Sequence, residues 1–190
     1  MSRPHPDISP VRMTSGNGSL NREDEQLAVL ARETGDALAR AGVRLVTAES
    51  CTGGWIAKLL TDLPGSSAWF ERGFVTYSNE AKTELLGVPA TLIAEHGAVS
   101  EHTVCAMAAG ALEHSRGDLS VAVSGVAGPG GGTSAKPVGT VWLAWSGGGR
   151  ESGARRFHFD GDRDAVRRQA VAAALEGILD RLHENAGQRE

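Results

Sequence analysis

The sequence has little of what several classes of protein require. Its 190 residues include only two cysteines, Cys51 and Cys105, and a single tyrosine. Two cysteines so far apart form neither a disulfide framework nor the closely spaced pair of a zinc knuckle. The sequence therefore predicts a protein of a reducing compartment with no metal site.

Long apolar runs and an excess of positive charge are also missing. No segment approaches the roughly 18 apolar residues of a membrane span, and the N-terminus has no apolar signal core. The net charge of −4 provides no chain-wide positive field for a phosphate backbone. We therefore expect a cytoplasmic protein that binds neither a membrane nor nucleic acid.

The length and the 41% of hydrophobic residues suit a single domain. Residues 1–21 mix Pro, Ser, Gly and Asn with little periodicity, which predicts a flexible tail ahead of a domain over 22–185, with a second tail over 186–190. Apolar periodicity and turn residues predict helices at 23–41, 53–63, 80–87, 90–95, 100–114 and 162–183, and strands at 43–48, 73–78, 119–125, 138–145 and 154–159. Because the two element types alternate early and two strands follow each other late, we expect an α/β fold with a mixed sheet covered by helices.

The stretch "TAESCTGG", residues 47–54, places Ser50 between an expected strand and a helix that starts at glycine. Free backbone amides and the positive end of the helix meet there. Ser50 and Thr52 either cap the helix, the commoner role, or lie beside amides that bind a phosphate or an oxyanion. Cys51 is either a thiol whose pKa the helix lowers or an ordinary buried cysteine.

Lys82 is the second candidate, on the first turn of the helix after "TYSNEA". The helix dipole disfavours a charged amine there. A pKa of about 7–8 instead of about 10.4 requires about 4 kcal/mol, so a catalytic lysine here has to be partly buried. The commoner alternative is an exposed surface lysine. Tyr77, at the end of an expected strand, either takes part or simply packs.

The third candidate is the glycine-rich loop "SGVAGPGGG", residues 124–132, where backbone amides can approach a ligand closely. Lys136 adds a charge suited to a phosphate, although a mobile surface loop is the alternative. The loop matches neither the Walker spacing nor a dinucleotide fingerprint. Arg163 can reach a carboxylate or phosphate, whereas His96 and His102 have no acidic partner that completes a metal set.

Seven stretches together carry a resemblance to one family: "TAESCTGG", "GFVTYSNEAK", "LLGV", "HGAVS", "SGVAGPGGG", "KPVGTVW" and "FDGDRDAVR". From about Glu25 to Leu182 the chain resembles the CinA C-terminal domain family, which includes nicotinamide mononucleotide amidohydrolases. The resemblance implies an α/β fold and hydrolysis of a pyridine nucleotide carboxamide to nicotinate mononucleotide and ammonia. It implies that the protein needs no metal or organic cofactor. It also implies a homodimer. In longer relatives another domain comes first, so this chain looks like the free-standing form.

The resemblance also implies roles for individual residues. Ser50 is the expected nucleophile, Lys82 its base and Tyr77 a helper in proton transfer, and Ser124, often Thr in relatives, orients the amide or stabilises the oxyanion. The residues expected to bind substrate are Cys51, Thr52, Gly53, Gly54, Gly125, Gly128, Gly131, Lys136 and Arg163. Two alternatives stay open: hydrolysis of another amide, and a catalytically silent protein that binds a nucleotide or a partner in competence or DNA damage.

Overall fold

The computed structural model describes residues 22–186. The expected tails lie outside this range, except that Ala186 is the last residue of the final helix. The helices are α1 (Arg22–Ala41), α2 (Trp55–Thr61), η1 (Ser66–Ala68), α3 (Asn79–Leu86), α4 (Ala90–His96), α5 (Glu101–Glu113) and α6 (Arg163–Ala186). The strands are β1 (Leu45–Glu49), β2 (Phe70–Val75), β3 (Leu119–Gly125), β4 (Thr140–Gly147) and β5 (Arg150–His158).

The five strands form one mixed sheet in the order β2-β1-β3-β4-β5. β1 lies parallel to both β2 and β3, while β4 is antiparallel to β3 and β5 is antiparallel to β4. A tight glycine turn joins β4 to β5, and the parallel strands are joined through helices, as such strands require. The expected fold class is confirmed.

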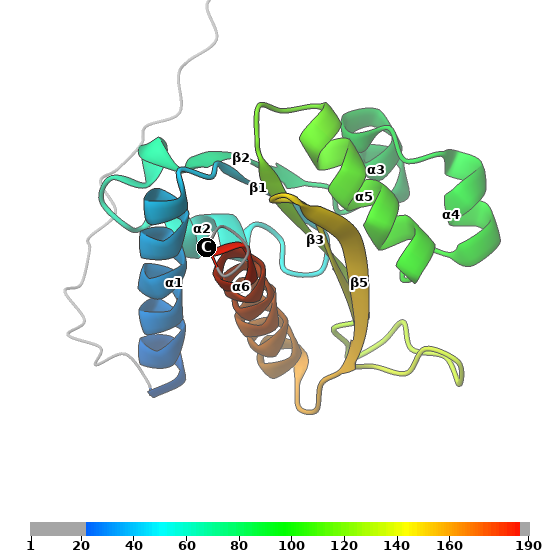
Figure 1. Ribbon diagram of the computed structural model, residues 1–190. Helices are drawn as coiled ribbons and strands as arrows, with labels where there is room; N and C mark the ends of the chain where they lie inside the picture. Colours follow the sequence, from blue (N-terminus) through cyan, green and yellow to red (C-terminus); the bar gives the residue numbers. More distant parts are fainter. Residues whose placement is uncertain (1–21, 187–190) are drawn as a thin grey trace, which may run out of the picture.

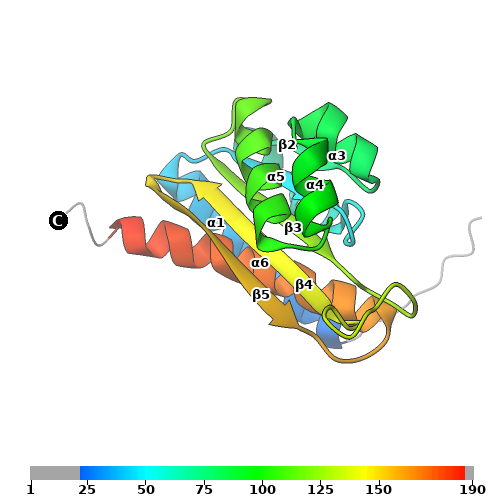
Figure 2. The ribbon, with the colours of Figure 1, turned by 90° about the vertical axis from the view of Figure 1, so that its right-hand side faces the viewer.

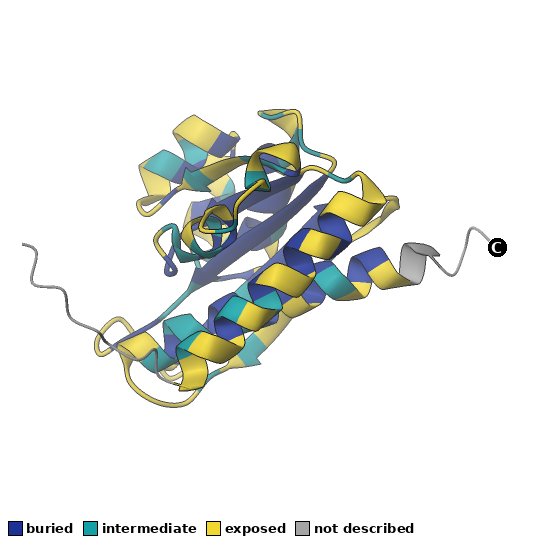
Figure 3. Cartoon of the chain, turned by 90° about the vertical axis from the view of Figure 1, so that its left-hand side faces the viewer, coloured by how far each residue is buried: buried dark blue, intermediate teal, exposed yellow. Residues whose placement is uncertain are grey.

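Helices cover both faces of this sheet (Figures 1 and 2). α1, α2 and α6 pack on one face, and α3, α4 and α5 pack on the other. The central strands β1 and β3 are buried almost throughout because both of their faces are covered. α1 and α6 lie side by side, with their buried residues turned to the sheet and their exposed residues turned to solvent (Figure 3).

The sheet order brings three chain segments together at the carboxyl ends of the parallel strands. The carboxyl ends of β1, β2 and β3 are neighbours, since Ser50 N–H donates to Val123 O and Thr76 N–H donates to Glu49 O. α3 follows β2 directly and packs against α5, where a Cβ on Gly110 would lie 1.9 Å from the carbonyl oxygen of Leu86. This close approach packs the end of α3 against α5.

Several local predictions differ from the structure, and the fifth strand, predicted at 154–159, begins already at Arg150. The second strand was expected at 73–78 but runs from Phe70 to Val75, so Thr76 and Tyr77 lie in the loop after it. Its polar residues Glu71 and Arg72 hid its start, and an edge strand tolerates them because one side faces solvent. The short helix η1 was not expected at all.

Candidate active site

The side chains of Ser50 and Lys82 meet where the carboxyl ends of β1, β2 and β3 lie side by side. Lys82 Nζ lies 3.2 Å from Ser50 Oγ, within hydrogen-bond distance. Ser50 follows the last residue of β1, and Lys82 is on the first turn of α3, whose N-cap Ser78 accepts a hydrogen bond from Ala81 N–H. Two residues 32 positions apart are thus brought together by a strand end and a helix start.

Lys82 is almost completely buried, with 1% of its surface exposed. The alternative of an exposed surface lysine is therefore wrong. Its amine also lies 2.9 Å from the carbonyl oxygen of Thr76 and 3.3 Å from that of Ser78, and it forms no ion pair with a carboxylate in residues 22–186. Burial lowers the pKa of the Lys82 amine, because desolvation disfavours its charged form.

The helix cap after β1 comes from Glu49, which sequence reasoning missed. Its buried carboxylate accepts hydrogen bonds from the backbone amides of Gly54, Ile56 and Ala57 and from the hydroxyl of Thr52. The expectation that Ser50 or Thr52 caps this helix is wrong, because the glutamate takes that place. The signal was a charged residue at the end of a strand that has no other charged residue.

The turn after Ser50 depends on its two glycines, since Gly53 and Gly54 have φ angles of +63° and +92°. Cys51 is buried beside them, and burial raises the pKa of its thiol to about 12. The thiol is therefore an uncharged packing group, and the alternative of a thiol with a lowered pKa is wrong. Arg167, also missed by the sequence analysis, donates from α6 to the carbonyl oxygens of Cys51 and Thr52.

A second cluster joins the β2–α3 loop to the glycine-rich loop. Arg163, at the start of α6, donates one hydrogen bond to the phenol oxygen of Tyr77 (3.0 Å) and another to the carbonyl of Gly128 (2.8 Å). Tyr77 is 61% exposed, and its phenol does not lie between Ser50 and Lys82 in a hydrogen-bonded chain. The arginine thus ties together two segments that border the edge of the sheet.

Ser124 lies next to Ser50 across the parallel β1–β3 pair, because Glu49 pairs with Val123. It is buried and its hydroxyl donates to the carbonyl of Ala98 at 2.8 Å. Gly125 continues β3, and a Cβ there would meet the β4 backbone, with Thr140 O only 2.9 Å away. The glycine therefore allows the two strands to approach closely.

Lys136, another predicted site residue, lies against the end of α4. Its amine donates to the carbonyl of His96, and it lines a cavity of about 290 Å³ with His102, Trp142 and Arg156. Ser124, Trp142 and Arg156 pair in register across β3, β4 and β5, so this cavity begins two strands beyond Ser50. Gly131 is exposed in the same glycine-rich loop.

Residues 22–186 hold no group of three His, Cys, Asp or Glu side chains that could bind a metal ion. No helix in this range is long and apolar enough to cross a membrane. The chemistry available at the edge of the sheet is that of a serine hydroxyl beside a buried amine.

The fold and this site define an α/β protein with a serine hydroxyl beside a buried lysine amine at a strand-to-helix turn. The model of the CinA C-terminal domain matches residues 27–182, and the chain belongs to that family. It is 55% identical over 162 residues to "Nicotinamide-nucleotide amidohydrolase PncC" of Escherichia coli K12, covering 85% of this chain and 98% of that protein.

Two further matches cover a similar share of this chain. The protein of the same name from Pseudomonas putida is 57% identical over 155 residues, covering 82% of this chain and 96% of the relative. The crystal structure of competence/damage inducible protein CihA from Agrobacterium tumefaciens superposes with a TM-score of 0.79 at 44% identity, covering 82% of this chain and 94% of that one. The match therefore covers the helices and the sheet that build the site.

Proposed function

We propose that this protein hydrolyses the carboxamide of nicotinamide mononucleotide to nicotinate mononucleotide and ammonia. The relatives from E. coli and P. putida carry the name of that activity, and they match this chain over nearly their whole length. The observation that supports the chemistry is the contact of 3.2 Å between Ser50 Oγ and the buried amine of Lys82. The enzyme is a hydrolase of the carbon–nitrogen bond of a linear amide, and its substrate is a small pyridine nucleotide.

The mechanism begins with the uncharged amine of Lys82. It accepts the proton of Ser50, and the resulting alkoxide attacks the carboxamide carbon to give a tetrahedral intermediate. The ammonium of Lys82 then returns the proton to the leaving nitrogen, so that ammonia departs and an acyl-serine ester remains. Water, deprotonated by the same amine, hydrolyses the ester and releases nicotinate mononucleotide.

We propose a role for Tyr77 other than the proton transfer that the family resemblance implies. The direct contact between Ser50 and Lys82 needs no phenol relay, and the Tyr77 phenol is bonded to Arg163. We assign Tyr77 and Arg163 to substrate binding, with Gly128 of the glycine-rich loop held by the same guanidinium. A guanidinium in this position suits an anionic group of the nucleotide.

The developing oxyanion needs hydrogen-bond donors close to Ser50. Gly54 N–H is taken by Glu49 and Gly53 N–H by the carbonyl of Ser50, so neither serves. The amides of Cys51 and Thr52 are the donors we propose. Ser124 helps only if its hydroxyl leaves the carbonyl of Ala98 when substrate binds.

The remaining assignments concern the phosphate and the assembly. Lys136 is proposed to meet the phosphate from the cavity that it shares with Arg156, which requires the nucleotide to extend across β3 and β4. We also propose a cytoplasmic homodimer. Edge strand β2, with its exposed last residue Val75, supplies a surface for the second copy.

The test is ammonia release by the purified protein from a panel of pyridine nucleotides and simple amides. Release from nicotinamide mononucleotide, but not from nicotinamide, supports the proposal. A rise in melting temperature without ammonia would instead identify a silent nucleotide-binding protein. Release only from another amide would keep the hydrolase and change its substrate.

A further inference from the structure

Arg167 holds the turn after Ser50 from the face of the sheet opposite Lys82. Its Nε donates to the carbonyl of Cys51 at 3.1 Å, and its Nη2 donates to the carbonyl of Thr52 at 2.8 Å. Its guanidinium lies over the ring of Trp55, 5.2 Å from the centroid. Two hydrogen bonds and an aromatic contact therefore fix the direction of two successive carbonyl groups.

The direction of a carbonyl fixes the direction of the next amide. In a trans peptide the C=O of one residue and the N–H of the following residue point in opposite directions. Since the carbonyl of Cys51 points to Arg167, the N–H of Thr52 points away from α6. α6 and α3 cover opposite faces of the sheet, so this N–H points toward the side of Lys82.

The amides around Ser50 are divided into two groups. Those of Gly53, Gly54, Ile56 and Ala57 donate to Ser50 O or to the carboxylate of Glu49. Those of Cys51 and Thr52 donate no hydrogen bond to any other residue within 22–186, although the amide of Cys51 lies against its own thiol. The amides next to the nucleophile are therefore the ones that lack a partner in another residue. Because Thr52 is fully buried, substrate binding has to open the turn before a ligand can reach its N–H.

We propose that Arg167 is a positioning residue for the amide hydrolysis. Its two hydrogen bonds turn the N–H of Thr52 toward the carbonyl oxygen of the bound carboxamide, where negative charge develops as Ser50 attacks. Arg167 itself touches no substrate atom. The inference rests on the proposed function and adds to it a residue that acts on the transition state through the backbone.

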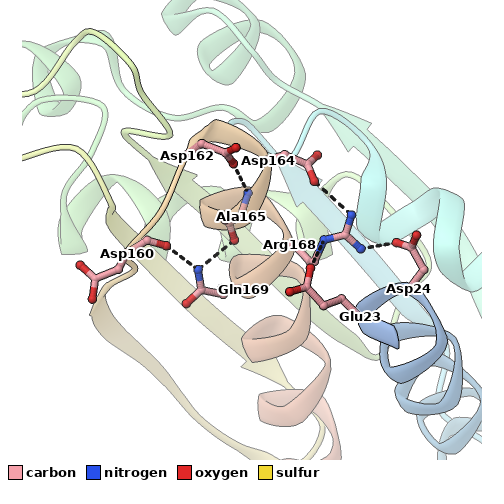
Figure 4. A network of polar contacts seen from close by, with 8 residues as sticks. All are labelled: Glu23, Asp24, Asp160, Asp162, Asp164, Ala165, Arg168 and Gln169. Carbon is pink, nitrogen blue, oxygen red and sulfur yellow. Dashed lines mark hydrogen bonds and ion pairs between the residues drawn. The ribbon is translucent and has the colours of Figure 1, made fainter. Parts of the chain in front are cut away.

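The neighbouring Arg168 provides a matched control. It also lies over Trp55, at 5.1 Å, but it pairs with Glu23, Asp24 and Asp164 and makes no contact with the turn (Figure 4). Arg168→Ala should lower the melting temperature and leave kcat unchanged. Arg167→Ala should lower kcat for nicotinamide mononucleotide by about 10- to 100-fold with little change in KM, because a misdirected oxyanion donor affects only the transition state. The kcat of Arg167→Lys, which keeps one flexible donor group, should lie between that of Arg167→Ala and that of the parent protein. This variant replaces Arg167→Ala in the test if the alanine variant does not fold.

A sulfur substitution separates this role from a general loss of structure. Sulfur is a weaker hydrogen-bond acceptor than oxygen, so thionicotinamide mononucleotide should react more slowly than the oxygen substrate in the parent protein. The rate with the oxygen substrate divided by the rate with the sulfur substrate should fall by about 10-fold in Arg167→Ala. The same ratio should stay at the parent value in Arg168→Ala. A parental ratio or a parental kcat in both Arg167 variants would overturn the role of Arg167. A parent protein that releases no ammonia would instead overturn the proposed function.

Discussion

Ser50 Oγ and Lys82 Nζ lie 3.2 Å apart, and the amine of Lys82 has backbone carbonyls as its other close partners. An uncharged amine has two hydrogens and one lone pair. When the hydrogens point to the carbonyls of Thr76 and Ser78, the lone pair is left for the hydroxyl of Ser50. The backbone therefore orients the base as well as burying it.

The rate of hydrolysis should depend on the protonation of Lys82. Its pKa is lowered by burial, so log kcat/KM should rise with pH and level off at a pKa below about 10.4. Lys82→Met keeps the volume but removes the base, and should lower kcat by about 10²–10⁴. The measurement is a pH–rate profile of ammonia release, and an unchanged profile in Lys82→Met would contradict the assignment.

The same shift makes a prediction about stability. A folded-state pKa below the unfolded value means that the unfolded chain binds more protons between the two values. The free energy of unfolding should therefore gain a positive contribution from Lys82 as the pH rises from the folded to the unfolded pKa. Urea titrations at several pH values in this range give the free energy of unfolding at each pH. That free energy should rise less steeply with pH in Lys82→Met than in the parent protein.

The carboxylate of Glu49 should contribute strongly to the free energy of unfolding, because it accepts hydrogen bonds from three backbone amides of the turn and of α2. Glu49→Gln replaces one carboxylate oxygen with an amide group that cannot accept the backbone N–H groups, and should lower the free energy of unfolding by about 2–4 kcal/mol. The control is Glu80→Gln, an exposed glutamate in the first turn of α3, which should change it by less than about 0.5 kcal/mol. Equal effects in chemical denaturation would show that the cap is unimportant.

Tyr77 provides a test between relay and substrate binding. Tyr77→Phe removes the hydroxyl that Arg163 contacts, and should raise KM while lowering kcat by less than about 10-fold. Arg163→Ala should raise KM further, because it also releases the carbonyl of Gly128. A loss of kcat in Tyr77→Phe as large as that in Lys82→Met would restore the phenol to the proton path.

Cys51 should be chemically silent. Burial raises the pKa of the Cys51 thiol to about 12, so the thiol stays protonated near neutral pH and iodoacetamide should not inactivate the native protein. Cys51→Ala should retain activity, because the thiol is a buried packing group. Rapid labelling of Cys51 in the native protein, measured by mass spectrometry with the urea-unfolded chain as reference, would contradict this.

Local patterns in the sequence were sufficient for the fold class and for every element except η1, although the second strand was placed three residues too late. Apolar periodicity marked the helices, and the order of the elements predicted a mixed sheet. They did not predict which helix cap or which cation serves the turn after Ser50. Glu49 acts on amides up to eight residues away, and Arg167 lies 116 positions from Cys51. The burial of Lys82 was also hidden, because it depends on the packing of α3 rather than on neighbouring residues. Contacts that tertiary structure creates leave little trace in spacing or composition.

The rate of ammonia release from nicotinamide mononucleotide by Ser50→Ala tests the central claim most directly. This variant removes one oxygen atom from a site that the parent and variant otherwise share. If the hydroxyl next to Lys82 is the nucleophile, the rate should fall by at least about 10³-fold while the melting temperature stays at the parent value. A variant that still releases ammonia at nearly the parental rate would contradict the account.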